Sequence, residues 1–257
     1  MRSPIAVSLL LSLCLACKSE EKKPVEQQPA VEPAKPSGSD ASRPAQPELS
    51  VSMTEHFTHA DALEQAVIDG DLDEVKVHAS WLVDELPAAT LPEAWQPSLA
   101  RMQAAAGEAA KAENLASAAS ATAKVIETCG ACHAAVGGGP KFATATPVPE
   151  GETSQARMQR HQWAAERMRE GMIGPSDERW QLGASAVSVA PPEPCPIENA
   201  EILAKDVLDL REKIYEVGAK AAAVKTADER AQVYGEYLST CARSSAVLTA
   251  AAFAPTS

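Results

Sequence analysis

The chain has 257 residues and a formal net charge of −12, so binding to the phosphate backbone of nucleic acids has no electrostatic support. The length fits one or two domains. Only 4% of the residues are aromatic, whereas alanine, the best helix former, is very frequent. This composition favours an all-α fold over a β-rich one.

The first 17 residues have the pattern of an export signal, in which Arg2 precedes an apolar run from Ile5 to Leu15. The run is too short to span a bilayer comfortably. Leu15-Ala16-Cys17 resembles the lipobox of bacterial lipoproteins, although Cys14 stands where leucine is usual. The resemblance implies lipidation of Cys17, and Lys18 after it implies a periplasmic protein anchored in the outer membrane of a Gram-negative bacterium. The alternative is ordinary secretion with cleavage near Ala16.

Two breaks divide the rest of the chain. Residues 18–50 are rich in Pro, Glu, Ser and Lys and nearly lack large apolar side chains, which predicts a disordered tether. Residues 143–154 form a second Pro-, Thr- and Gly-containing segment, which predicts a linker. The expected domains are therefore residues 51–142 and 155–257.

These two domains look like copies of one unit. Met53-x-x-His56 matches Met158-x-x-His161 at an offset of 105 residues, and Thr128-Cys129 matches Thr240-Cys241 at an offset of 112. Seven extra residues would then lie near positions 191–196. A shared register across two helical segments predicts a tandem repeat.

Each copy is predicted to hold four helices, which in the first copy cover about 55–69, 72–86, 93–112 and 113–135. In the first helix His56, Ala60, Leu63 and Val67 fall on one stripe at helical spacing. Gly70 ends this helix and Asp71 caps the next. We therefore expect two tandem four-helix bundles.

The candidate functional motif is the run Cys129-Gly130-Ala131-Cys132-His133 in the fourth predicted helix. Cys-x-x-Cys-His is the attachment signature of c-type haem: the thiols form thioethers with the haem vinyl groups, and the histidine binds the iron. A zinc site would normally use a second ligand pair, and a redox dithiol would lie in a βαβ setting. A plain disulfide would give His133 no role. The motif predicts one covalent haem c on Cys129, Cys132 and His133.

The motif closes its domain after three helices, and this order resembles the cytochrome c′ family, four-helix bundles with haem on the last helix. The resemblance covers roughly residues 53–142. After His133 that family often has an aromatic–arginine pair, whereas this chain has Ala134-Ala135-Val136-Gly137. The resemblance also implies a sixth iron position that is vacant or filled from the first helix, and a homodimer formed through the first two helices.

The sequence offers several sixth ligands. His56 is the first candidate because it shares the apolar stripe of the first helix and would give a bis-histidine haem. His59, Met53, Met102 and a vacant site are the alternatives, and His78 is expected at the surface. His161 matches His56 in the second copy, where no haem is expected, so a merely hydrogen-bonded histidine also remains open.

The second copy lacks the full motif, because Ser244 and Ser245 stand where the first copy has Cys132 and His133. Cys241 is therefore expected to pair with Cys195 in a disulfide or to remain a free thiol. Four aromatic residues are expected to fill the space that haem occupies in the first copy. They are Trp163, Trp180, Tyr215 and Tyr237.

Together these expectations describe an envelope-anchored monohaem cytochrome that carries single electrons between redox proteins and is not an enzyme. The rival function is binding or sensing of nitric oxide or carbon monoxide at a vacant sixth position. A peroxidase is disfavoured because His56 has no obvious arginine partner for acid–base work.

Overall fold

The computed structural model describes residues 46–85, 91–191 and 205–252, and side chains are described outside 46–51, 205–208 and 246–252. This part of the chain holds eight α-helices and no strand, which confirms the predicted all-α class. All of it belongs to one compact unit, residues 41–257. The predicted signal segment and most of the predicted tether lie outside the described residues.

The helices of the first half lie close to their predicted places. They are α1 (Gln46–Asp69), α2 (Leu72–Asp84), α3 (Gln96–Ala110, after a 3₁₀ turn at Glu93–Trp95) and α4 (Leu115–Val136). Helix α1 starts at Gln46, so the predicted tether is wrong over its last five residues. Pro47 falls in the first turn of the helix, where its missing N–H removes no hydrogen bond.

Local signals explain the boundary between α1 and α2. Gly70 adopts a φ of 79°, a left-handed conformation that ends α1 at low cost. The Asp71 carboxylate then accepts hydrogen bonds from the backbone N–H groups of Asp73 and Glu74 at 3.1 and 3.0 Å. These contacts confirm the predicted stop and N-cap.

The second half repeats this order in α5 (Ser154–Ile173), α6 (Asp177–Ala186), α7 (Lys205–Ala223) and α8 (Ala227–Ala252). Helices α2 and α6 begin at Leu72 and Asp177, 105 residues apart, and α4 and α8 begin at Leu115 and Ala227, 112 residues apart. These two pairs of helix starts follow the two offsets seen in the sequence, whereas α1 and α5 begin at Gln46 and Ser154, 108 residues apart.

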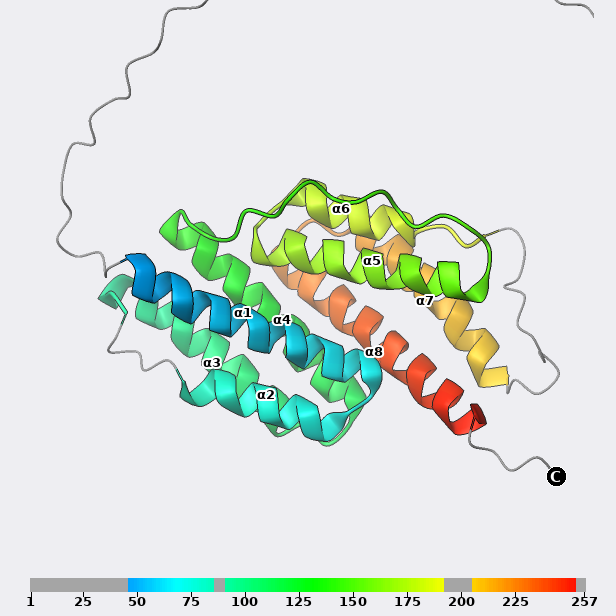
Figure 1. Ribbon diagram of the computed structural model, residues 1–257, viewed down its shortest axis with the longest axis horizontal. Coiled ribbons are helices and arrows are strands. Elements are labelled where there is room, and N and C mark those ends of the chain that lie inside the picture. Colours follow the sequence, from blue (N-terminus) through cyan, green and yellow to red (C-terminus); the bar gives the residue numbers. More distant parts are fainter. Residues whose placement is uncertain (1–45, 86–90, 192–204, 253–257) are drawn as a thin grey trace, which may run out of the picture. The chain divides into compact units, whose positions relative to one another are not determined.

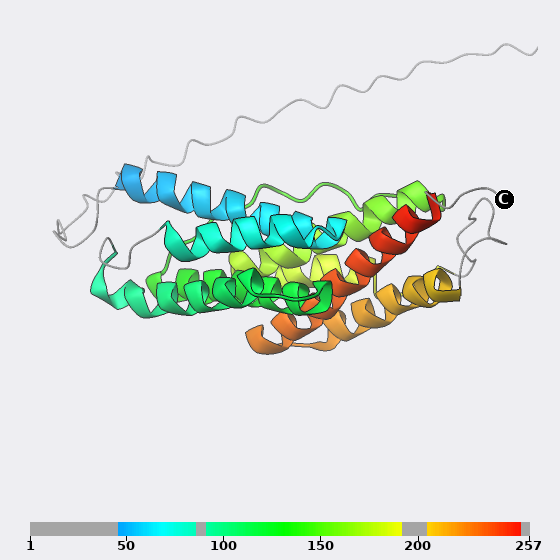
Figure 2. The same ribbon diagram turned by 90° about the horizontal axis from the view of Figure 1, so that it is seen from below.

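Contacts within each half run in a closed order. Helix α2 packs on α1 and α3, and α4 packs on α3 and α1, while α6 packs on α5 and α7, and α8 packs on α7 and α5. In the view of Figure 2, α1 and α2 lie above α3 and α4. The two halves also contact each other extensively, since α4 packs along α8, α1 against α8, and α5 against α4.

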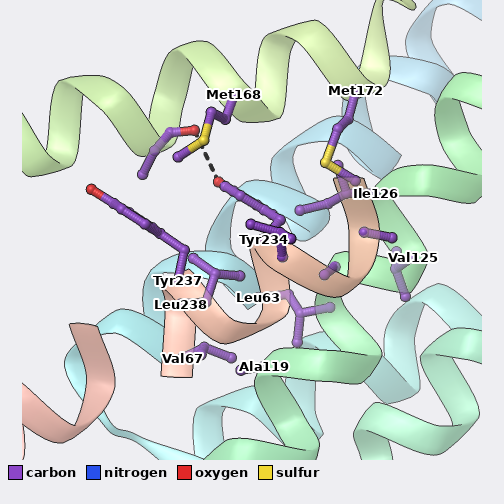
Figure 3. Packing of buried hydrophobic residues seen from close by; sticks show 14 of the residues in the cluster. Leu63, Val67, Ala119, Val125, Ile126, Met168, Met172, Tyr234, Tyr237 and Leu238 are labelled. Carbon is purple, nitrogen blue, oxygen red and sulfur yellow. Dashed lines mark hydrogen bonds between the residues drawn. The ribbon is translucent and has the colours of Figure 1, made fainter. Parts of the chain in front are cut away.

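One hydrophobic core consequently spans both halves. Leu63 of α1, Ile126 of α4, Met168 of α5 and Tyr234 of α8 are fully buried and belong to the same cluster (Figure 3). The Tyr234 hydroxyl donates to the Ala165 carbonyl oxygen at 2.9 Å, so its polar end is satisfied inside the core. Ala60, Leu63 and Val67 of the predicted stripe are buried as expected, whereas His56 is partly buried.

The segment between the halves, residues 138–153, has no helix and runs along α5 and α6 (Figure 1); we call it the strap. Arg179 of α6 donates to the carbonyl oxygens of Phe142, at 3.3 Å, and of Ala143. Trp163 Nε1 donates to the Thr146 carbonyl oxygen at 3.2 Å. The predicted linker is thus fixed against the helices by side chains of the second half.

Candidate haem-attachment site

The Cys-x-x-Cys-His motif occupies the last two turns of α4. This helix begins with Asn114, whose side chain accepts from the Ser117 N–H at 2.9 Å, and ends at Gly137, with a φ of 66°. Residues three and four apart share one face of a helix, so Cys129, Cys132 and His133 project from the same side of α4. The predicted attachment residues are therefore brought together by the local helix alone.

Both thiols of the motif are free in the structure. Cys129 packs against the hydrophobic core. Burial, followed by the neighbouring Cys132, raises the pKa of the Cys129 thiol to about 12, so this sulfur is protonated and uncharged in the folded chain.

The imidazole of His133 is oriented by a helix of the other half. Its Nδ1 lies 2.8 Å from the carbonyl oxygen of Ile173, the last residue of α5. A carbonyl oxygen only accepts, so Nδ1 carries the ring hydrogen and Nε2 carries the free lone pair. Histidine ligands in metal sites are commonly held in this way, with the second ring nitrogen bonded to a backbone carbonyl.

The backbones of α4 and α5 approach each other closely, and this lets His133 reach the Ile173 carbonyl oxygen. A Cβ atom on Gly130 would lie 1.9 Å from the Met172 carbonyl oxygen, so the first variable position of the motif has room only for glycine. A Cβ on Gly139 of the strap would lie 2.9 Å from Cγ of His133. The imidazole thus lies between the end of α5 and the strap and is partly buried.

A small cavity lies on another face of α4 from the attachment residues. It has a volume of about 130 Å³ and is lined by Gly130, Ala131 and Ala134 of α4, with Met172 and Arg230 across from them, and by none of the three motif side chains. Small-molecule sites typically enclose about 300–1,000 Å³. This cavity is therefore not the haem pocket, and the fit of the motif to haem c rests on its donor set of two thiols and one imidazole.

His56 is the candidate sixth ligand that the structure leaves without a hydrogen bond. Its Nε2 is buried and has no hydrogen-bond partner. Burial, and then the nearby His59, lowers its pKa, which keeps the imidazole neutral and its lone pair available. The ring stands edge-on to Trp81 of α2 at 5.4 Å between centroids.

Aromatic contacts place the first half of α1 at the same end of the molecule as the motif. Phe57, next to His56, lies 6.4 Å from Phe142 of the strap between ring centroids. Phe142 in turn packs against Gly174, which follows Ile173, the hydrogen-bond partner of His133.

The other predicted ligands have different surroundings. His59 stacks on Trp81 at 3.7 Å, and its Nδ1 lies 3.1 Å from Nδ1 of His78. His78, expected at the surface, is partly exposed there and its ring is paired with His59. Met102 is buried in the core, and Met53 is partly buried against it.

The second half carries a different set of groups at the corresponding place. Cys241 has a free thiol whose pKa burial raises to about 12, and Ser244 donates to the Thr240 carbonyl oxygen of its own helix at 2.9 Å. Cys195 lies outside the described residues, so the Cys195–Cys241 disulfide stays a prediction. Cys17 also lies outside them.

The four aromatic side chains expected in the interior of the second half are all buried: Trp163, Trp180, Tyr215 and Tyr237.

Within the described ranges, no three His, Cys, Asp or Glu side chains converge to form a complete metal site. None of the helices described there is both long and apolar enough to cross a membrane. Comparison of this chain with known protein families, with characterised proteins and with solved structures finds no match.

Sequence reasoning did not find two residues of this site. Ile173 acts through its backbone carbonyl, 40 residues from His133. No pattern of side chains in the sequence predicts such a contact. Gly130 could have been noticed, because a glycine inside a buried helix often permits close approach of another backbone.

Proposed function

We propose that this chain is a monohaem c-type cytochrome that transfers single electrons in the cell envelope, with haem c on Cys129, Cys132 and His133. The observation that carries the proposal is the hydrogen bond from His133 Nδ1 to Ile173. It prepares Nε2 as a ligand directly beside two free thiols on the same helix face.

Each residue has a separate part in this proposal. Cys129 and Cys132 provide the two thioether sulfurs, and His133 provides the proximal imidazole. When bound, haem c supplies an iron that changes valence by one electron while its ligands stay in place. The end of α5 fixes the orientation of His133, and Gly139 of the strap lies against its ring.

We assign the sixth position to His56, which favours electron transfer over gas binding. A buried imidazole nitrogen without a hydrogen-bond partner is costly to a fold, and such groups commonly serve a ligand or ion. Nitric oxide or carbon monoxide binding would require a vacant or displaceable sixth position instead. The function is therefore decided by whether His56 binds the iron.

The arrangement of helices supports a tandem pair of four-helix units in which only the first holds haem. The closed contact order within each half and the matching helix starts fit this repeat. Trp180 and Tyr237 are fully buried where the first half has the smaller Val75 and Val125. Large aromatic side chains would fill the volume that a haem-less unit leaves.

We place the protein in the periplasm, tethered to the outer membrane through a lipid on Cys17. The tether of about 28 residues up to α1 would let the helical part range over roughly 30 Å, at 5–6 Å times the square root of the residue number. The net charge of −12 suits a basic redox partner. A homodimer is also part of the proposal.

Optical spectra of the oxidised and reduced protein, with and without carbon monoxide, test this function. We expect low-spin haem that refuses carbon monoxide, and conversion by His56→Gln to a high-spin form that binds it promptly. His161→Gln is the matched control, because His161 occupies the equivalent place in α5 and contacts Tyr215 at 3.2 Å. Prompt carbon monoxide binding by the unaltered protein would favour the gas-binding function instead.

A further inference from the structure

We propose that His59 of α1 and His78 of α2 form a second metal site, separate from the haem site, which binds a divalent transition ion such as Zn²⁺ through their facing Nδ1 atoms. The two histidines lie 19 residues apart in the sequence and on adjacent helices. Imidazole nitrogen suits ions of borderline softness, such as Zn²⁺ and Cu²⁺.

The separation of the two nitrogens fits a shared ion. Zinc–nitrogen bonds are about 2.05 Å long, so two nitrogens on one ion lie about 2.9 Å apart at a bond angle near 90° and about 3.3 Å apart at the tetrahedral angle. The Nδ1 atoms of His59 and His78 lie 3.1 Å apart, between these two values. An ion at these bond lengths lies off the line between the two nitrogens, so each ring must turn to aim its lone pair at the ion, while the separation of the helices can stay as it is.

Neighbouring groups contact both rings. The indole of Trp81 stacks on His59 at 3.7 Å with an interplanar angle of 7°. The Glu74 carboxylate, one turn before His78, lies 3.6 Å from Nε2 of His78. A carboxylate there favours the tautomer with hydrogen on Nε2 and the lone pair on Nδ1, as in carboxylate–histidine–zinc arrangements.

Ions can reach the pair from solvent, and the surroundings are acidic. The side chain of His78 is 23% exposed, and His59 is also only partly covered. Burial, and then the neighbouring His78, lowers the pKa of His59 and keeps its lone pair available, while Glu55 and Glu85 act in the opposite direction. Since the described residues bring no third ligand to the pair, water would complete the coordination.

The second half of the chain has no such pair, which provides a natural comparison. At the offset of 105, Ala164 and Gly183 take the places of His59 and His78. The proposal is also independent of the haem: it uses the two histidines that pair with each other and leaves His56 for the iron.

Calorimetric titration of the untagged, haem-loaded chain with Zn²⁺ tests the site. We expect one Zn²⁺ per chain, loss of that binding in His59→Gln and in His78→Gln, and about 10-fold weaker binding in Glu74→Gln. His161→Gln should bind Zn²⁺ like the unaltered protein. Circular dichroism of each variant checks that the helices persist.

Cu²⁺ provides a second readout that does not depend on affinity alone. Its magnetic resonance spectrum should show coupling to two equivalent nitrogens, and this coupling should disappear in His78→Gln. Absence of Zn²⁺ binding by the unaltered chain, or Zn²⁺ binding by His59→Gln and His78→Gln that is as tight as in the unaltered chain, would overturn the proposal. A change of the haem spectrum in His59→Gln without any Zn²⁺ effect would instead assign His59 to the iron.

Discussion

Glu64 of α1 and Arg169 of α5 occupy equivalent positions of the two halves, 105 residues apart, and their buried side chains approach each other to 3.6 Å. Arg169 also contacts Asp61 at 2.8 Å. Burial raises the pKa of Glu64 to about 7, even though Arg169 acts in the opposite direction. The contact between the two halves therefore includes a carboxyl group that takes up a proton below neutral pH.

This proton makes the stability of the fold depend on pH. The pKa of Glu64 is about 7 in the folded chain against an ordinary value of 4.5, so between these values the folded chain holds more protons than the unfolded one. Protonation of Glu64 therefore adds about 3 kcal/mol to the free energy of unfolding below pH 4.5, and this contribution is lost as the pH rises to 7.

Urea denaturation at several pH values checks this prediction in the unaltered protein and in Glu64→Gln, which cannot titrate. The free energy of unfolding of the unaltered protein should fall relative to that of the variant between pH 4.5 and 7. Comparison of the two proteins cancels the titration of the histidines. Parallel pH profiles would show that Glu64 does not change its protonation in this range.

Gly130→Ala should destabilise the protein by about 1–3 kcal/mol, because the added methyl group would overlap the Met172 carbonyl and push α5 away from α4. Gly107→Ala in α3 is the matched control: nothing lies within 4 Å of its Cβ position. There the substitution should stabilise by about 0.5–1 kcal/mol through helix propensity. Denaturant midpoints measure both effects, and equal shifts in the two variants would contradict the close contact.

Arg179→Ala should loosen the strap. The guanidinium group bonds to Glu170 at 2.8 Å and to the Phe142 carbonyl at 3.3 Å, so its removal leaves the strap with fewer anchors. Loss of about 1.4 kcal/mol of charged hydrogen bonding should speed local opening about 10-fold. Trypsin cleavage after Lys141, an exposed strap residue, should accelerate accordingly. Arg101→Ala in α3 should leave this rate unchanged, and an unchanged rate in Arg179→Ala as well would mean that the strap is held elsewhere.

The parts of the fold that the sequence predicted are those decided by local chemistry. The stripe through Leu63 and Val67, the glycine stop at Gly70 and the cap at Asp71 each depend on neighbours within one or two turns. The attachment motif is local in the same sense, because its residues share one helix face. The start of α1 at Gln46 was not predicted. Its Pro-rich composition indicated a tether, although the first turn of a helix tolerates proline.

Contacts between the halves could not be predicted in the same way. The bond from His133 to Ile173 uses a backbone carbonyl, and the contact of His59 with His78 depends on how α1 lies on α2. Glu64 and Arg169 did offer a signal: residues of opposite charge stand at matching positions of the repeat, beside the apolar Leu63 and Met168. Only packing in three dimensions decides that they meet.

The most direct test of the account is the intact mass of the chain purified from cells that attach haem c. We predict the polypeptide plus one haem, loss of that haem in the Cys129→Ala, Cys132→Ala double variant, and retention of it in Cys241→Ala. A chain without covalent haem, or one that carries two haems, would contradict the account.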